Sequence, residues 1–316
     1  MQHTDRRILL LGKGGQVGWE LQRSLSVLGK VTALDFDSVE VEGQAVCADF
    51  SQPERVAQTV RALRPDVIVN AAAHTAVDKA QSEPELARLI NATTPGLIAQ
   101  EAKHLGAWLL HYSTDYVFDG TGTRPWVETD TPAPLNVYGQ TKLEGEQAIV
   151  QSGCQHLILR TSWVYGARGG NFAKTMLKLA QERDELKVIN DQMGAPTGAD
   201  LLADVSAQIL ARVLARVPHN AKQDSTFSGI YHGVAAGHTS WFEYANFVLD
   251  AAKSINPAML LRAKVLPVPT SAFPTPAPRP INSRMNTDKL QSTFDLRLPD
   301  WQLGVRRMLT EFLDKS

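Results

Sequence analysis

The sequence predicts an α/β protein: a Rossmann-type, doubly wound parallel sheet with a smaller, mixed α/β C-terminal lobe. Two observations predict this fold class. Short apolar runs alternate with longer stretches of helical periodicity, and a glycine-rich loop follows the first apolar run directly. Strands that alternate with helices pair in parallel and are covered on both faces. Ligands then bind at the carboxyl ends of the strands.

The N-terminal half of the chain carries this alternation most clearly. A further strand is expected to end at Asp49-Phe50, and a capping box, Ser51 to Glu54, is expected to open the second helix. The other expected strands are residues 7–11, 30–35, 66–70, 107–113 and 156–161. The expected helices are residues 16–28, 51–64, 84–105 and 137–151.

Beyond residue 161 the periodicity is looser. The proline-rich segment 267–280 cannot form a regular element, and is either a flexible linker or a rigid loop over a cleft. We expect residues 1–165, completed by parts of 198–240, to form a dinucleotide-binding domain, and the remainder of 166–316 a second lobe. Helices are expected near 171–183, 200–216, 240–253 and 301–313, and strands at 186–189, 230–234 and 264–268.

Composition excludes several classes of function. The 316 residues are 43% hydrophobic and 21% charged, as in soluble globular proteins. The net charge of −1 provides no basic field for nucleic acid or an anionic membrane. The N-terminus shows no apolar stretch of signal-peptide or membrane-span length. Cys47 and Cys154 are expected to be small buried residues in a reducing compartment, so we expect a cytoplasmic protein.

The loop Gly12-Lys-Gly-Gly15-Gln-Val-Gly18 is typical of dinucleotide binding. One glycine makes the turn, one admits the pyrophosphate to the backbone, and one lets the helix pack on the strand. A purely structural turn is the alternative. Asp35, 17 residues after Gly18, is expected to bind the adenosine ribose, with a solvated loop aspartate as the alternative. An aspartate favours NADH over NADPH, and Lys13 can offset that preference, so either cofactor is expected.

Tyr138 and Lys142 are spaced to lie one turn apart on the same face of a helix. The ammonium is expected to lower the phenol pKa from about 10, which would make the phenol a proton donor to a carbonyl that receives a hydride. Thr114, at the end of a strand, can hydrogen-bond the same carbonyl; a helix cap is its alternative role. Trp163 either stacks on a sugar or packs in the core.

With these motifs in order, the chain resembles the extended short-chain dehydrogenase/reductases and, within them, the family of dTDP-4-dehydrorhamnose reductases. The resemblance covers residues 7–313. It is carried by the segments 12–21, 70–78, 112–118, 135–142, 160–165, 190–197 and 279–284.

The resemblance implies that NADPH or NADH delivers hydride to C4 of dTDP-4-dehydro-6-deoxy-L-mannose. The product, dTDP-L-rhamnose, is the end of dTDP-rhamnose biosynthesis and a precursor of surface polysaccharides such as the lipopolysaccharide O-antigen. By this resemblance Tyr138 protonates the alkoxide, Lys142 lowers the phenol pKa and holds the nicotinamide ribose, and Thr114 shares the carbonyl hydrogen bond. Thr114, Asp115 and Trp163 are implied on the substrate, with segment 190–197 and Arg284 near the nucleotide.

The predicted cofactor-binding set combines the loop, the strand ends and the catalytic pair. It comprises Gly12, Gly15, Gln16, Val17, Gly18, Asp35, Asp49, Phe50, Ala71, Ala72, Ala73, Thr75, Tyr112, Tyr138 and Lys142. The resemblance also implies a magnesium site, through which some members form a homodimer. The matching positions are Glu20, Asp200 and Glu311, the second being aspartate where glutamate is usual.

Two alternatives differ in chemistry. One is a sugar-nucleotide epimerase or dehydratase of the same superfamily, which keeps NAD tightly bound and catalyses no net redox change. The other is a non-catalytic binding subunit similar to the regulatory subunit of methionine adenosyltransferase. The complete set of Tyr138, Lys142 and Thr114 argues against the second.

Overall fold

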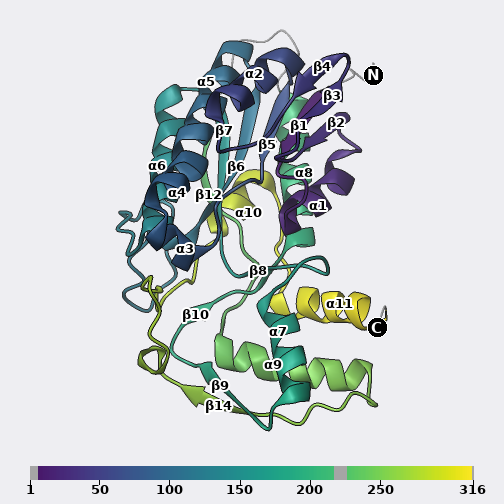
Figure 1. Ribbon diagram of the computed structural model, residues 1–316, viewed down its shortest axis with the longest axis vertical. Coiled ribbons are helices and arrows are strands. Elements are labelled where there is room, and N and C mark those ends of the chain that lie inside the picture. The colour runs from purple at the N-terminus through teal and green to yellow at the C-terminus, as the bar shows by residue number, and fades with distance from the viewer. Residues whose placement is uncertain (1–5, 217–225, 315–316) are drawn as a thin grey trace.

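The computed structural model describes residues 6–216 and 226–314. Residues 217–225, which fall within the segment expected to complete the first domain, lie outside the described residues, as do 1–5 and 315–316. Within the described part, a six-stranded sheet runs in the order β12-β7-β6-β5-β1-β2, with every pairing parallel (Figure 1). Its strands are β1 (Arg7–Leu11), β2 (Lys30–Leu34), β5 (Val67–Asn70), β6 (Trp108–Thr114), β7 (Gln155–Thr161) and β12 (Gly229–His232).

Helices cover both faces of this sheet because the side chains of each strand alternate between two apolar cores. Ile8 and Leu10 of β1 belong to one core, and Leu9 and Leu11 to the other. The first core contains α1 (Gln16–Leu25), α8 (Ala199–Arg216) and α10 (Asp288–Phe294). The second contains α2 (Pro53–Leu63), α5 (Thr94–Leu105) and α6 (Val137–Ser152). The predicted fold class is confirmed, although α10, which packs beside β12, was not expected in this part.

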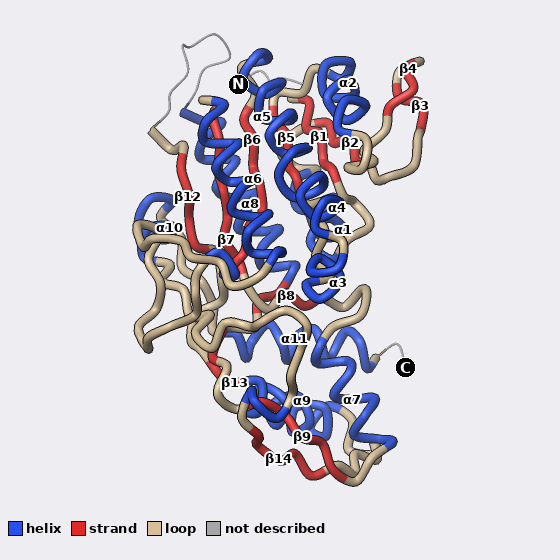
Figure 2. Tube along the Cα trace, turned by 60° about the vertical axis from the view of Figure 1, so that its left-hand side comes forward, coloured by secondary structure: helices blue, strands red, loops and turns tan. Residues whose placement is uncertain are grey.

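A second lobe lies below the sheet in both views (Figures 1 and 2). It has a separate apolar core, formed mainly by three helices and a parallel pair of strands. These elements are α7 (Phe172–Glu182), β9 (Glu185–Ile189), α9 (Trp241–Ile255), β14 (Lys264–Val268) and α11 (Trp301–Leu313). Two short pairings, β8 (Val164–Tyr165) with β11 (Thr197–Gly198) and β10 (Met193–Gly194) with β13 (Thr239–Ser240), accompany them.

Local expectations near the first helices were wrong. The strand expected to end at Asp49 is instead β4 (Gln44–Val46), which pairs antiparallel with β3 (Val39–Val41) outside the main sheet. The expected capping box does not form, because the Ser51 hydroxyl donates to Asp49 Oδ1 at 2.7 Å and α2 begins without a side-chain cap. Helix α1 ends at Leu25, three residues early.

The long helix expected over residues 84–105 is interrupted. It consists of α4 (Pro84–Arg88), a π-helical turn (Leu89–Thr93) and α5, and a further short helix, α3 (Val77–Ser82), precedes it. Pro95 has no N–H to continue the helical ladder, and the Thr94 hydroxyl donates to the Leu89 carbonyl at 2.9 Å. The proline-rich segment is also partly regular: β14 extends to Val268 and a 3₁₀ turn spans Thr270–Ala272. In residues 6–216 and 226–314 no helix is long and apolar enough to cross a membrane.

Candidate active site

A cavity of about 610 Å³ opens at the carboxyl ends of β1, β5, β6 and β7, and Trp241 of α9 in the second lobe completes its wall. Most of the predicted site residues line it. They are Gly12, Gly15, Gln16, Val17, Asp35, Ala71, Ala72, Ala73, Thr75, Tyr112, Thr114, Asp115, Tyr138, Lys142 and Trp163. Gly18, Asp49 and Phe50 do not line the cavity.

The glycine loop is shaped by close backbone contacts. Gly12 has a φ of 87°, and a Cβ there would lie 2.7 Å from the Ala72 nitrogen. A Cβ at Gly18 would collide with the Gly12 carbonyl oxygen, so this glycine serves the packing of α1 on the loop. Asp35 Oδ2 accepts from the Gly14 N–H at 2.9 Å and braces the loop from the end of β2. The loop thereby leaves space where a dinucleotide pyrophosphate can approach the backbone.

Asp49 and Phe50, predicted to flank the cofactor, are used elsewhere. The Asp49 carboxylate accepts from the Ser51 hydroxyl and from Gln52 Nε2, at 2.7 and 2.6 Å, in the turn before α2. The hydrogen bond from Ser51 lowers the pKa of Asp49, with Gln52 adding to the effect. Phe50 is buried in the core beneath α2 and α5. Neither residue lines the cavity, although the neighbouring Ala48 N–H donates to the carbonyl of Asp35, which does, at 3.1 Å. Their contact with the cofactor stays a prediction.

Tyr138 and Lys142 both reach the cavity from α6, as their spacing predicted. The expected lowering of the phenol pKa by Lys142 is not found. Burial raises the pKa of Tyr138 to about 12, and a side-chain hydrogen bond with Thr114 partly opposes that rise. The reason is the direction of Lys142, whose Nζ donates to the Tyr112 carbonyl at 2.6 Å. Burial lowers the pKa of Lys142 to about 8, and Glu146, one turn further along α6, opposes that shift.

Thr114 caps a short turn, and its role toward the substrate carbonyl stays a prediction. Its Oγ1 accepts from the Tyr116 backbone N–H at 3.2 Å, which caps the 3₁₀ turn Asp115–Val117. The same hydroxyl lies 3.1 Å from Asp115 Oδ1, and it lies close enough to the Tyr138 phenol to lower its pKa. Asp115 is buried, its Oδ2 has no hydrogen-bond partner among the described residues, and burial raises the pKa of its carboxyl to about 6. Thr114 and Tyr138 are therefore placed to hold one carbonyl oxygen between them.

The raised pKa of Asp115 predicts a pH-dependent effect of Asp115→Asn on stability. The folded-state pKa of about 6 exceeds the ordinary value of about 3.9, so the charged carboxylate destabilises the folded protein at neutral pH. The stability from the protonated form is fully present below about pH 4 and is lost as the pH rises through 6. We expect the change in the free energy of unfolding caused by Asp115→Asn to be more favourable at pH 7.5 than at pH 4, by about 1–3 kcal/mol. Thermal unfolding at both pH values measures this difference, and an equal change at both would contradict the assignment.

Trp163 and Trp241 stack on each other at the cavity wall, with ring centroids 3.6 Å apart and an angle of 14° between the planes. Trp163 has a φ of 49°, a left-handed conformation that is rare for a bulky residue and common at functional sites. Trp241 was not predicted. The capping box formed by Ser240 and Glu243 marks the start of α9, but it does not indicate that the first residue of the helix reaches the cavity.

A second cavity of about 310 Å³ adjoins the first, and Tyr116 and Trp241 line both. Gln192, from the predicted segment 190–197, lines it. So does Arg279, whose Nη2 lies 2.7 Å from Asp78 Oδ2. Nη1 of Arg279 is buried and has no hydrogen-bond partner in the described part of the chain. Arg284, predicted near the nucleotide, lines neither cavity, because its Nε donates to Asn282 Oδ1 at 2.9 Å.

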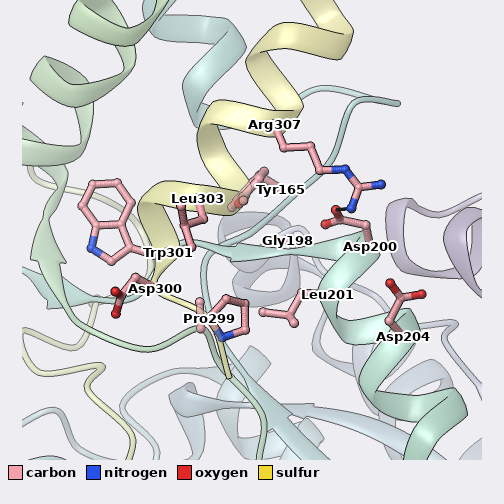
Figure 3. Close-up of a pocket in the computed structure, with 12 residues that line it drawn as sticks. Tyr165, Gly198, Asp200, Leu201, Asp204, Pro299, Asp300, Trp301, Leu303 and Arg307 are labelled. Carbon is pink, nitrogen blue, oxygen red and sulfur yellow. Dashed lines mark ion pairs between the residues drawn. The ribbon is translucent and has the colours of Figure 1, made fainter. Parts of the chain in front are cut away.

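The predicted magnesium ligands do not fit a metal. Glu20, Asp200 and Glu311 influence one another: burial raises the pKa of Glu20, and the charges of Asp200 and Glu311 raise it further. However, Asp200 Oδ2 lies 3.3 Å from Arg307 Nη1, at the edge of a separate cavity of about 280 Å³ (Figure 3). Across the described ranges, no group of three or more His, Cys, Asp or Glu side chains is arranged to hold a metal ion. The Arg307 guanidinium provides the positive charge beside Asp200 instead.

Comparisons with known proteins show the family to which the chain belongs. The chain matches the family described as RmlD substrate binding domain over residues 6–314. It is 59% identical over 304 residues to dTDP-4-dehydrorhamnose reductase of Escherichia coli (strain K12), covering 96% of this chain and 97% of that one. The Salmonella typhimurium enzyme of the same name is 60% identical over 304 residues, with 96% and 97% coverage. The structure resembles that of dTDP-4-dehydrorhamnose reductase from Bacillus anthracis in complex with NADP, with a TM-score of 0.82, 32% identity, and coverage of 99% of this chain and 100% of that one. The chain therefore belongs to the RmlD family, that of the dTDP-4-dehydrorhamnose reductases.

Proposed function

We propose that this protein reduces the C4 ketone of dTDP-4-dehydro-6-deoxy-L-mannose to dTDP-L-rhamnose, with NADPH or NADH as the reductant. The observation that carries the chemistry is that Thr114, Tyr138 and Lys142 line one cavity, which begins at the glycine loop. Membership of the family supplies the substrate.

The cavity suits a nicotinamide cofactor along one side. Gly12 and Gly15 keep Cβ atoms away from the site of the pyrophosphate, at the N-terminus of α1. The cavity wall beside the end of β5 is formed by small side chains, which leave room for the cofactor: Ala71, Ala72 and Ala73. When bound there, the reduced cofactor supplies the hydride for C4.

Tyr138 then supplies the proton. A phenol with a pKa of about 12 is fully protonated at neutral pH, so it donates to the alkoxide oxygen that forms as hydride reaches C4. Thr114 holds the same oxygen before transfer. Lys142 lies one turn from Tyr138 and lines the same cavity, with its Nζ held by the Tyr112 carbonyl.

The second cavity is suited to the nucleotide part of the substrate. The buried Nη1 of Arg279 has no partner among the described residues, and a diphosphate oxygen would provide one. Phe172 and Trp241 form aromatic walls on which a pyrimidine ring can pack. Since Tyr116 and Trp241 line both cavities, one sugar nucleotide can extend from Tyr138 to Arg279.

We expect Arg279→Met to raise the KM for the sugar nucleotide by about 10- to 100-fold, because a hydrogen bond to a charged group contributes about 1.5–3 kcal/mol. The KM for NADPH should stay unchanged, since Arg279 does not line the cofactor side. Asp78→Asn is the matched control: it removes the ion pair with Arg279 and keeps the guanidinium. Steady-state kinetics with each substrate varied test this placement, and an equal rise of KM in both variants would contradict it.

Incubating the purified protein with NADPH and the keto sugar nucleotide distinguishes the enzyme classes. The proposal predicts one NADPH oxidised for each dTDP-L-rhamnose formed. A protein that retains bound NAD and consumes neither added NADPH nor NADH would be an epimerase or dehydratase. No turnover of any kind would favour a binding subunit.

We also propose that the enzyme acts in the cytoplasm, because both cysteines, Cys47 and Cys154, are buried and unpaired. A homodimer stays a prediction of the family resemblance. Within one chain, Asp200 is ion-paired with Arg307, and this arrangement provides no metal site through which two chains could be bridged.

A further inference from the structure

A buried polar pair lies beside Lys142, outside the cavity. Asn70 and His111 are neighbours in the register of β5 and β6, only 1% and 0% exposed, and neither lines the cavity. Asn70 Nδ2 lies 2.9 Å from His111 Nδ1, and His111 Nε2 lies 3.4 Å from Lys142 Nζ. The three side chains form a continuous hydrogen-bonded chain that ends on a residue of the proposed catalytic set.

The direction of this chain follows from a backbone amide. The Ala72 N–H, which can only donate, lies 3.0 Å from Asn70 Oδ1, so the amide oxygen of Asn70 faces Ala72. The amide nitrogen of Asn70 must then face His111 and donate to Nδ1. With Nδ1 as acceptor, a neutral imidazole carries its proton on Nε2, directed at Lys142. Complete burial and the neighbouring Lys142 charge both lower the pKa of His111, which keeps the ring neutral.

An imidazole N–H directed at Lys142 distinguishes the two protonation states of the amine. A neutral amine can accept from Nε2, whereas an ammonium has only donors to present and is repelled. The Tyr112 carbonyl accepts from either state. The Glu146 carboxylate favours the ammonium form of Lys142, but it is already ion-paired with Arg160, whose Nη2 lies 2.6 Å from Glu146 Oε2. Tyr138, on the same helix, is the remaining titratable neighbour from the proposed catalytic set.

We propose that His111, oriented by Asn70, is a positioning residue that stabilises the neutral amine of Lys142 when Lys142 gives up a proton during turnover. This inference rests on the proposed function, in which Tyr138 becomes a tyrosinate after protonating the product. The Nζ–H bond of Lys142 breaks, and its proton passes through solvent in the cavity that both residues line to the Tyr138 oxygen, where an O–H bond forms. The amine lone pair then accepts the His111 N–H. Lys142 regains its proton from solvent through the cavity.

Asn70→Asp reverses the direction of the hydrogen bonds from residue 70 through His111 to Lys142, with little change in the shape of the side chain. An aspartate still accepts from the Ala72 N–H, but it also accepts from His111 Nδ1, so the imidazole proton moves there and Nε2 becomes an acceptor for the Lys142 ammonium. We expect Lys142 to titrate at a pH higher by about one unit or more. The direct measurement is a ¹³C NMR titration of lysine-labelled protein without substrate, with the Lys142 signal assigned by its loss in Lys142→Arg.

Two further variants keep the test decisive. His111→Leu removes the N–H altogether and should also raise the pH at which Lys142 titrates. Thr141→Val, on the same helix as Lys142, is the matched control: it removes a buried hydrogen bond that Asn91 Nδ2, in the π-helical turn, donates to the Thr141 hydroxyl, and it leaves the Asn70–His111–Lys142 chain intact, so no change is expected. An unchanged or lower titration of Lys142 in both folded variants would overturn the proposal. Because the titration needs no substrate, a failure of the proposed reaction would be seen separately, in the product assay.

Discussion

Tyr138→Phe should lower kcat by about 10²- to 10⁴-fold, the usual contribution of a positioned proton donor. The phenol lies beside Thr114 in the cavity where the alkoxide would form, and no other described hydroxyl of α6 lines that cavity. Affinity for NADPH should be nearly unchanged, because the ring remains and only the hydroxyl is lost. Steady-state kinetics and a fluorescence titration of NADPH binding measure the two effects separately.

Tyr231→Phe is the matched control for this loss. Tyr231 is also buried, but its hydroxyl donates to the Phe227 carbonyl at 2.9 Å in the core beside α10, away from the cavity. It should therefore leave kcat unchanged. If Tyr138→Phe retained near-normal kcat, another group would have to be the proton donor, and the central assignment of the site would be wrong.

Glu146→Ala should cause the largest loss of stability. Arg160 Nη2 and Nε bond both carboxylate oxygens of Glu146, at 2.6 and 2.9 Å, and both side chains are only 2% exposed. Removing the carboxylate leaves the Arg160 guanidinium buried and uncompensated, which costs about 3–5 kcal/mol. Urea unfolding followed by circular dichroism measures the change in the free energy of unfolding.

The double variant Glu146→Leu/Arg160→Met separates the cost of an orphaned charge from the value of the ion pair. It removes both charges while keeping similar volume, and the introduced methionine can pack against Phe118, whose ring now faces the Arg160 guanidinium. We expect this double variant to be more stable than Glu146→Ala. Equal destabilisation would mean that the pair itself, rather than the orphaned charge, determines the stability of this region.

The sequence predicted those parts of the molecule that depend on local pattern. The apolar run before Gly12 and the apolar run that follows Asp66 identified two strands inside the main sheet. The spacing of Tyr138 and Lys142 placed both on one face of α6. It missed features that depend on distant partners. The strand expected before Asp49 lies outside the main sheet because β4 pairs with β3, and the helix after Pro84 is interrupted by a π-helical turn.

In the candidate site too, local pattern predicted some features, whereas others depend on residues distant in sequence. The identity of Tyr138 as a cavity residue followed from spacing, but the direction of its pKa shift did not. That direction depends first on the burial of the phenol, and Lys142 does not oppose it because its Nζ donates to the Tyr112 carbonyl on β6, far from α6 in sequence. The stacking of Trp241 on Trp163 likewise joins two lobes, and no local motif predicts it.

Tracing the hydride tests the central claim most directly. The protein is incubated with the keto sugar nucleotide and with NADPH carrying deuterium at both C4 positions of the nicotinamide, and the product is analysed by NMR. The proposed reaction predicts dTDP-L-rhamnose with one deuterium at C4 of the sugar for each cofactor oxidised. Formation of a different sugar nucleotide, or of dTDP-L-rhamnose without deuterium at C4, would contradict it.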